Sequence, residues 1–344
     1  MKKLLIISGV LIEPGQVREI HLPISETPNA RSTILPITVV RGVEEGPCIF
    51  LTAAVHGDEL NGIAILKSLM IKIKPEKLRG ALIIVPIVNM LGFLGESRYL
   101  SDRRDLNRMF PGTPTGNMAQ RIAYKFFHEV IRHADAGIDF HTGAENRENF
   151  PHVRGDLKNI QVRKYAKAFG CRIIIDQKGL KGTLRYAATE RKIPTIVFEG
   201  GTANTFQRPI VQTGVRGTIR FLRNLGMLRE KRRFSRKRSL PFQIVAKKAL
   251  WVRADRGGLL ELKVHPGELL YRGDPVAIIS NPLGRDVHGI SAPMTGLVIG
   301  VTTSPLVSPG MPIVHMVEIN RTLKTIEKHL KNRKLTLAFP NHIG

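Results

Sequence analysis

Two residues in the first quarter of the chain, His56 and Glu59, have the types and the spacing that can bind a metal ion. They follow the apolar run 49–54, which is typical of a buried strand, and Gly57 between them lets the backbone turn sharply. Such a turn can aim an imidazole nitrogen and a carboxylate at one point, as in many open catalytic zinc sites. An open catalytic zinc site needs a third protein ligand. Alone, the pair is a weak signal, since His and Glu three residues apart also occur by chance in polar loops.

The third ligand is expected further along the chain. The strand-like run 136–140 delivers His141 at its end, and another such run, 194–198, ends at Glu199. Two histidines and one glutamate with an open fourth position are the arrangement for metal-assisted hydrolysis. In α/β folds, loops at strand ends carry the active site, so these residues are expected to meet. Glu199 would be the additional carboxylate that a hydrolytic zinc site needs.

The segments around these residues alternate between strand and helix patterns. The strand-like runs are 49–54, 82–88, 172–176 and 194–198, and the helix-like runs are 62–73, 120–132 and 182–190. Strand, helix and strand in succession imply a parallel unit. Residues 1–48 contain short apolar runs broken by proline and predict a β-rich lead-in.

The composition changes near residue 229. Seven basic residues and one acid lie between 229 and 238, a pattern typical of a linker. Short strand-like runs separated by Gly- and Pro-containing turns then predict a small all-β domain. The expected divisions are a catalytic domain over 1–228, a basic linker over 229–242, the all-β domain over 243–318 and a basic tail over 319–344.

The chain is strongly basic, with a formal net charge of +25 from 53 Lys and Arg against 28 Asp and Glu. Its field should attract anions, from acidic small molecules to nucleic acid. Only Cys48 and Cys171 are present, in no metal or redox spacing, which favours a reducing compartment. No apolar run reaches the ~18 residues of a membrane helix. We therefore expect a soluble, cytoplasmic protein without a membrane partner, and the oligomeric state stays open, a homo-oligomer included.

Four short motifs in a fixed order carry a resemblance to a known family. They are His-Gly-Asp-Glu at 56–59, Asp-Leu-Asn-Arg at 105–108, His-Thr-Gly at 141–143 and Glu-Gly at 199–200. With them, residues 20–318 resemble the aspartoacylase and succinylglutamate desuccinylase family, a branch of the zinc carboxypeptidase superfamily. The resemblance implies an α/β fold, with a mixed, largely parallel central sheet flanked by helices and a C-terminal all-β barrel-sandwich domain. It also implies one Zn²⁺ per chain.

The same resemblance implies a role for each motif residue. His56, Glu59 and His141 would be the zinc ligands, and Glu199 would take a proton from the attacking water and pass it to the leaving amine. Such proton handling agrees with the chemistry of a carboxylate beside a metal-activated water. Asp105 would orient a ligand histidine from outside the metal shell.

The arginine-rich segment 89–112 supplies the candidates for substrate binding. By the resemblance, Asn107 and Arg108 hold the substrate carboxylate, for which a guanidinium has the matching bidentate geometry. Arg98 and Arg103 both compete for the arginine that polarises the scissile carbonyl. We assign that role to Arg98 and keep Arg103 as a substrate-binding candidate.

The all-β segment also resembles, more remotely, biotinyl and lipoyl carrier domains. Carriers need a lysine at a hairpin tip, and no lysine occurs between His265 and Asn320. A carrier role is therefore not expected. The segment is instead predicted to shape or partly close the substrate cleft.

The expected function is zinc-dependent hydrolysis of an amide bond in a carboxylate-bearing substrate, with a small acidic N-acyl amino acid as the leading partner. A first alternative is a carboxypeptidase that removes acidic C-terminal residues from a peptide or protein. A second is a nucleic-acid- or ribosome-associated binding protein on a hydrolase scaffold, using the basic linker and tail. That alternative predicts that one or more of the metal-ligand residues have been lost, whereas every proposed ligand is present. A working hydrolase that its basic segments bring to an acidic macromolecule combines the two.

Overall fold

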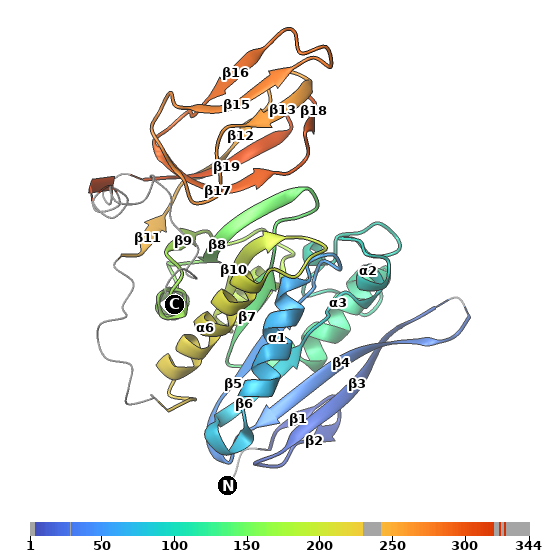
Figure 1. Cartoon of the computed structure of the whole chain (residues 1–344). Coiled ribbons are helices and arrows are strands. Elements are labelled where there is room, and N and C mark those ends of the chain that lie inside the picture. The colour runs from blue at the N-terminus through green and yellow to red at the C-terminus, as the bar shows by residue number, and fades with distance from the viewer. Residues whose placement is uncertain (1–3, 28, 230–241, 320–322, 325–326, 328–344) are drawn as a thin grey trace.

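The structure is a computed structural model and describes residues 4–27, 29–229, 242–319, 323–324 and 327 (Figure 1). The predicted basic linker and basic tail lie almost entirely outside these residues. In the described part of the chain, no helix is long and apolar enough to cross a membrane.

The described residues form a mixture of strands and helices. The strands are β1 (Ile6–Ile7), β2 (Val10–Leu11), β3 (Val17–Glu26), β4 (Ser32–Arg41), β5 (Glu44–Ala53), β6 (Arg79–Val85), β7 (Ala136–His141), β8 (Arg147–Gly155), β9 (Ile173–Asp176), β10 (Thr195–Thr202), β11 (Ile244–Ala246), β12 (Ala249–Arg253), β13 (Gly258–Leu262), β14 (Leu269–Leu270), β15 (Pro275–Ser280), β16 (His288–Ser291), β17 (Gly296–Thr302), β18 (Leu306–Val307) and β19 (Pro312–Glu318). The helices are α1 (Asn61–Lys72), α2 (Met90–Leu94), α3 (Met118–Glu129), α4 (Ile160–Phe169), α5 (Leu184–Glu190) and α6 (Arg208–Asn224), with short 3₁₀ turns η1 (Pro75–Lys77), η2 (Leu106–Arg108) and η3 (Ile131–His133).

One long mixed sheet organises the molecule. Its strand order is β12-β19-β17-β8-β10-β7-β5-β6-β4-β3. The predicted α/β fold with a mixed sheet is confirmed, but the expectation of a largely parallel sheet is wrong outside the centre. Only β10, β7, β5 and β6 form the parallel part of this path, and β8, β4 and β3 run antiparallel to their neighbours. Parallel neighbours need a crossover helix, whereas the short β3–β4 and β7–β8 connections reverse the chain without one.

Several predicted elements differ from the observed ones in extent. The strand expected to end at residue 198 continues as β10 to Thr202, so Glu199 lies within a strand rather than after it. Pairing with β8 carries the strand past the two glycines, with a register shift between Glu199 and Gly201. The segment 89–112, expected as a loop, contains α2 and η2. Strand β8 and helices α4 and α6 have no counterpart among the predicted elements.

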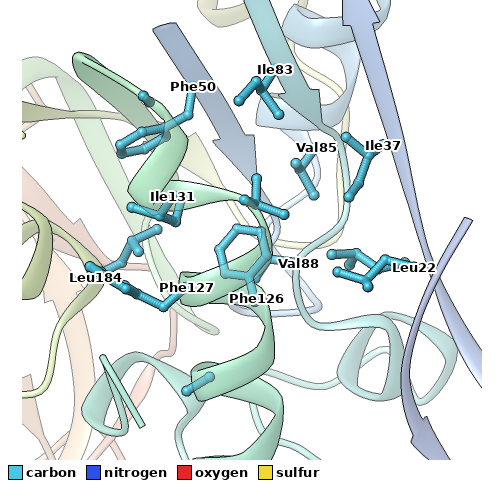
Figure 2. Close-up of a cluster of buried hydrophobic side chains, with 14 of the residues drawn as sticks. Leu22, Ile37, Phe50, Ile83, Val85, Val88, Phe126, Phe127, Ile131 and Leu184 are labelled. Carbon is cyan, nitrogen blue, oxygen red and sulfur yellow. The ribbon is translucent and has the colours of Figure 1, made fainter. Parts of the chain in front are cut away.

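Two apolar clusters cover opposite faces of the central strands. Phe50 and Val85 pack toward Phe126 of α3 on one face (Figure 2). Leu51 and Phe198 belong to the cluster that α1, α4 and α6 cover on the other face. Successive residues of a strand point to opposite faces, so Phe50 and Leu51 serve different clusters although both are fully buried. The polar side chains of the site lie on the α3 face.

The C-terminal strands continue the same sheet. β17 pairs with β8, with Gly300 opposite Asn149, and β19 and β12 follow beyond it (Figure 1). A second sheet, β16-β15-β13-β18, packs with these strands around an apolar cluster that includes Val276, Val298 and Val314. The C-terminal part is therefore joined to the α/β part by backbone hydrogen bonds as well as by the chain.

We expect Phe50→Ala to lower the free energy of unfolding by about 3–5 kcal/mol, because it removes a fully buried ring from the centre of the sheet. The Phe50 ring fills the space beside Gly137, where an added Cβ would lie 2.1 Å from it, so Gly137 offers no side chain to fill the cavity. Urea titration would measure the loss. Ile71→Ala, at a side chain that is 66% exposed, is the control and should change stability by less than about 0.5 kcal/mol.

Candidate metal centre

The loop after β5 places His56 and Glu59 beside the end of β7. Its backbone is tied to the segment after β6, because the amides of Val88 and Asn89 donate to the carbonyl oxygens of Ala53 and Ala54. Gly57 is required by a close approach: a Cβ there would lie 2.0 Å from the carbonyl carbon of Gly92 in α2. The sharp turn expected at this glycine is therefore also a packing contact.

His56, Glu59 and His141 come together as one buried cluster. Glu59 lies between the imidazoles, with Oε1 2.7 Å from His56 Nδ1 and Oε2 2.7 Å from His141 Nδ1. One ligand atom from each residue can be chosen so that all three lie within 4.8 Å of one another. Two imidazole nitrogens and a carboxylate are a donor set that zinc accepts, and both histidines present the same ring nitrogen. The cluster fits the metal that the motifs imply.

A second carboxylate contacts the far nitrogen of each histidine. Asp105 Oδ1 lies 3.2 Å from His56 Nε2, and Asp139 Oδ2 lies 2.8 Å from His141 Nε2. Asp139 can accept from Nε2–H of His141, which leaves Nδ1 with its lone pair directed at the cluster, as outer carboxylates orient ligand histidines. Asp105 lies beside His56 Nε2 at ion-pair distance, and its Oδ1 accepts from the backbone amide of Asn107 at 2.8 Å. Thr52 in turn donates to Asp139 Oδ1 at 2.7 Å. Asp105 therefore lies beside His56, the candidate ligand that it could orient.

Asp139 is absent from the motif residues. It precedes His141 by two positions on β7, so both side chains point to the same face of the sheet. A carboxylate two residues before a candidate ligand, in an otherwise apolar strand, is the signal by which the sequence could have revealed it.

Charge in the cluster favours a bound cation. Burial lowers the pKa of the His141 imidazole, but Asp139 and Glu59 raise it more, and the net pKa lies well above its usual value. Burial raises the pKa of Glu59, yet the two imidazoles hold it well below its usual range. Glu59 therefore stays ionised although it is buried, and a divalent cation can supply the compensating charge in place of ring protons.

Arg98 lies at the metal centre, whereas Arg103 does not. The Arg98 guanidinium donates from Nη2 to Asp105 at 2.9 Å, and its Nη1 is 3.4 Å from Glu59 Oε1. Arg103 is exposed and does not line the cavity described below. Of the two competing arginines, the structure brings only Arg98 to the metal cluster.

Asn107 and Arg108 lie at η2 on the rim of the same cavity. The Asn107 side-chain oxygen accepts from the backbone amide of Leu184 at 2.9 Å, which fixes the start of α5 against η2. Arg108 is 42% exposed at its side chain and donates to the Asn107 carbonyl oxygen at 2.7 Å. Its remaining guanidinium donors can therefore reach a ligand from solvent.

Glu199 lies on β10, in register with His141 of β7. Its Oε2 accepts from Asn149 Nδ2 at 3.0 Å, and its Oε1 lies 3.6 Å from Arg154 Nε. Both partners come from β8, the strand that the sequence patterns do not reveal. The Glu199 carboxylate therefore lines the cavity, and its two side-chain contacts both come from β8.

These groups surround a cavity of about 270 Å³. Five arginines line it: Arg98, Arg108, Arg147, Arg154 and Arg185. Burial and Arg154 lower the pKa of the Arg185 guanidinium to about 10, and its Nη1 has no hydrogen-bond partner among the described residues. Such a cavity favours anionic ligands.

Trp251 of β12 and His315 of β19 form part of the cavity wall. Their rings stack, with centroids 4.4 Å apart and planes 9° apart, and the Arg147 guanidinium lies 4.9 Å from the Trp251 ring. Burial and the guanidinium groups of Arg154 and Arg147 lower the pKa of His315 to about 3, so its imidazole is neutral. The C-terminal strands thus help to shape the cavity, in line with the sequence-based expectation.

Comparison with known proteins identifies the same family as the motifs. Residues 45–225 match the family model described as the succinylglutamate desuccinylase/aspartoacylase catalytic domain. The chain is 30% identical over 271 residues to N-alpha-acetyl-L-2,4-diaminobutyric acid deacetylase of Halomonas elongata, which covers 75% of this chain and 78% of that protein.

Solved structures of proteins with related names have a similar fold. A succinylglutamate desuccinylase/aspartoacylase from Rhodobacter sphaeroides superposes with a TM-score of 0.78 at 25% identity, over 89% of this chain and 96% of that one. The ectoine utilization protein EutE (DoeB) from Ruegeria pomeroyi gives a TM-score of 0.79 at 24% identity, over 90% and 98%, and shares the fold.

Because Asp139 holds the His141 ring, we expect Asp139→Asn to weaken zinc binding by about 10- to 100-fold without unfolding the protein. Titration of the metal-stripped protein with zinc against a competing chelator would measure the change. Asp102→Asn, on the arginine-rich segment and paired with Arg104, is the matched control and should leave zinc affinity unchanged. Equal affinity of the Asp139 variant and the unmutated protein would reject this role.

Proposed function

The chain belongs to the succinylglutamate desuccinylase/aspartoacylase family, and we propose that it is a zinc-dependent deacylase that hydrolyses the amide bond of a small, acidic N-acyl amino acid. The observation that carries the proposal is the buried cluster of His56, Glu59 and His141 in one cavity with Glu199. The relatives are deacylases, which supports hydrolysis of a carbon–nitrogen bond.

In this proposal, His56 and His141 bind zinc through Nδ1 and Glu59 binds it through its carboxylate. Bound zinc would polarise the scissile carbonyl and lower the pKa of water toward ~7, so that water becomes a nucleophile at neutral pH. Asp105 and Asp139 keep the two imidazoles in the ligand orientation.

Glu199 is assigned the proton transfers. Its Oε2 accepts from Asn149, while Oε1 accepts no hydrogen bond from the described residues and lies 3.6 Å from Arg154 Nε. Oε1 can therefore accept a proton from water and then deliver it to the leaving amine. A carboxylate is basic enough for this step only because the water is already activated.

Arg98 and the pair Asn107–Arg108 are assigned to the substrate. Arg98, anchored by Asp105, places its positive charge beside the ligands, where negative charge develops on the carbonyl oxygen. Arg108 would hold the substrate carboxylate from the rim, with Asn107 fixing the local backbone. Arg103 has no role in the proposal, because it does not line the cavity.

The arginines of the cavity favour an acidic substrate. The Halomonas elongata relative is named for an amino acid whose side-chain amine is free, and such an amine would be cationic at neutral pH. Beside Arg147, Arg154 and Arg185 a cation would be repelled, whereas a second carboxylate or a dicarboxylic acyl group would be attracted.

The size of the cavity favours a deacylase over a carboxypeptidase. Its volume of about 270 Å³ suits a small molecule, and Trp251 and His315 stand in its wall. We also propose that residues 243–318 form the barrel-sandwich domain that the resemblance implies, and that this domain limits the substrate to short acyl amino acids.

We expect the purified protein to bind about one zinc per chain and to hydrolyse acetyl and succinyl derivatives of aspartate and glutamate in a chelator-sensitive manner. Because like charges repel, N-alpha-acetyl-diaminobutyric acid should be a poorer substrate by about tenfold or more in kcat/KM. Glu199→Gln should retain zinc and lose turnover. Bound zinc without hydrolysis of any of these compounds would overturn the deacylase proposal, and cleavage of acidic dipeptides alone would favour the carboxypeptidase.

We expect Arg108→Ala to raise KM for carboxylate substrates by about 10- to 100-fold with a smaller change in kcat, because the lost ion pair contributes mainly to binding. Steady-state kinetics on one N-acyl aspartate would measure both constants. Arg104→Ala removes an exposed arginine of the same segment that does not line the cavity, and should leave KM unchanged. An unaltered KM in the Arg108 variant would exclude its role at the substrate carboxylate.

A further inference from the structure

His152 is a fully buried histidine beside the proposed proton-transfer carboxylate. It lies in the middle of β8, directly opposite Glu199 in the antiparallel β8–β10 pair. Residues opposite each other in such a pair point to the same face, so the two side chains share the face that bears the cavity. His152 itself does not line that cavity, so it cannot contact a substrate there.

The hydrogen bonds of His152 define its tautomer. Nδ1 lies 2.7 Å from the carbonyl oxygen of Phe150, which can only accept, so Nδ1 carries the proton. Nε2 then has a lone pair, and Arg154 Nε donates to it at 3.0 Å. A protonated ring would present a second donor to Arg154 instead. Burial lowers the pKa of this imidazole, as do Arg154, His315 and Arg185, and the carboxylate that faces the ring is Glu199, directly opposite on β10.

The same Arg154 nitrogen faces two acceptors. Arg154 Nε lies 3.0 Å from His152 Nε2 and 3.6 Å from Glu199 Oε1, so its single hydrogen is directed at the histidine. Arg154 Nη1 contacts Gln177 Oε1 at 3.4 Å, which holds the other end of the guanidinium. The positive charge therefore lies beside Glu199 without a close hydrogen bond to Oε1.

We propose that His152 is a positioning residue that keeps Arg154 from forming a close ion pair with Glu199. By accepting the Nε–H of Arg154, the neutral imidazole holds the guanidinium where its charge stabilises the Glu199 carboxylate and leaves Oε1 able to accept a proton. Without this acceptor, we expect Arg154 to donate its Nε–H to Glu199, because a buried donor without a hydrogen bond is costly and a carboxylate is a strong acceptor. Glu199 would then accept donors on both oxygens and be a poorer base.

If the proposed function holds, substitutions of His152 should change kcat through the position of Arg154. His152→Leu should lower kcat by about 10- to 100-fold, a fraction of what general acid–base catalysis contributes, with KM changed less than about twofold. His152→Gln, which keeps a side-chain acceptor near the position of Nε2, should recover a large part of the loss. Zinc content should be unchanged in both variants, because neither touches a ligand.

A double-mutant cycle separates positioning from general damage. Arg154→Gln alone should lower kcat, and adding His152→Leu to it should have no further effect, since His152 acts only through Arg154. Independent, multiplying effects of the two substitutions would overturn the inference. Val153→Ala is the matched control: Val153 is buried next to His152 but packs on the opposite face of the sheet, so it should lower the melting temperature and leave kcat unchanged.

A measurement without substrate tests the arrangement itself. In a protein labelled with ¹⁵N-histidine, NMR at neutral pH should show His152 as the neutral tautomer with the proton on Nδ1, assigned by loss of the signal in His152→Gln. A protonated ring, or a proton on Nε2, would overturn the inference even in a fully active enzyme. An inactive wild-type protein with the expected tautomer would instead count against the proposed function and leave the positioning of Arg154 supported.

Discussion

The buried carboxylate of Glu59 is the interaction on which the rest of the site depends. It contacts both candidate ligand histidines, His56 and His141, at 2.7 Å and accepts a hydrogen bond from the backbone amide of Thr142 at 3.1 Å. The contacts with His141 and Thr142 join the loop after β5 to the end of β7, two segments far apart in the chain, and the contact with His56 holds that loop together. Removing a carboxylate from water is costly unless such partners surround it, so the loop, the strand end and the outer carboxylates must all be in place together.

The register of the parallel strands places the remaining groups. Thr52, Asp139 and Val197 lie side by side on β5, β7 and β10, and His141 and Glu199 follow two residues further on the last two strands. Alternation along each strand then directs all of these side chains to one face, while the intervening residues fill the apolar cluster on the other. His141, Asp139 and Glu199 are therefore placed by one sheet, whereas His56 and Glu59 reach them from the loop after β5 and Asp105 from the segment before η2.

The motifs predict the candidate metal ligands, but they miss cavity residues that reach the site only through the pairing of strands. His56, Glu59 and His141 meet where the spacing and strand ends predict. Arg154 and the stacked Trp251 and His315 escape prediction, because they reach the site through pairing between strands that no short motif encodes. Asp139 lies on a predicted strand, two residues before His141, and is missed because it belongs to none of the four motifs. The choice between Arg98 and Arg103 likewise depends on backbone geometry: Arg103 adopts a left-handed φ of 62° in a turn that directs it to solvent. Helix and strand periods predict the central α/β units well, and they do not reveal that β8 returns antiparallel without a crossover.

The β8–β17 pairing has a consequence for how the chain can be divided. β8 carries Asn149, His152 and Arg154 on the cavity side and Phe150 in an apolar cluster with Leu297 and Ile299 of β17. A fragment that stopped after α6 would keep every proposed metal ligand, yet it would expose the edge of β8 and the Phe150 ring. An open apolar strand edge can pair with other chains and promote aggregation. The four sequence motifs therefore do not mark a transplantable module; the smallest unit that can be exchanged, permuted or expressed alone includes the C-terminal strands.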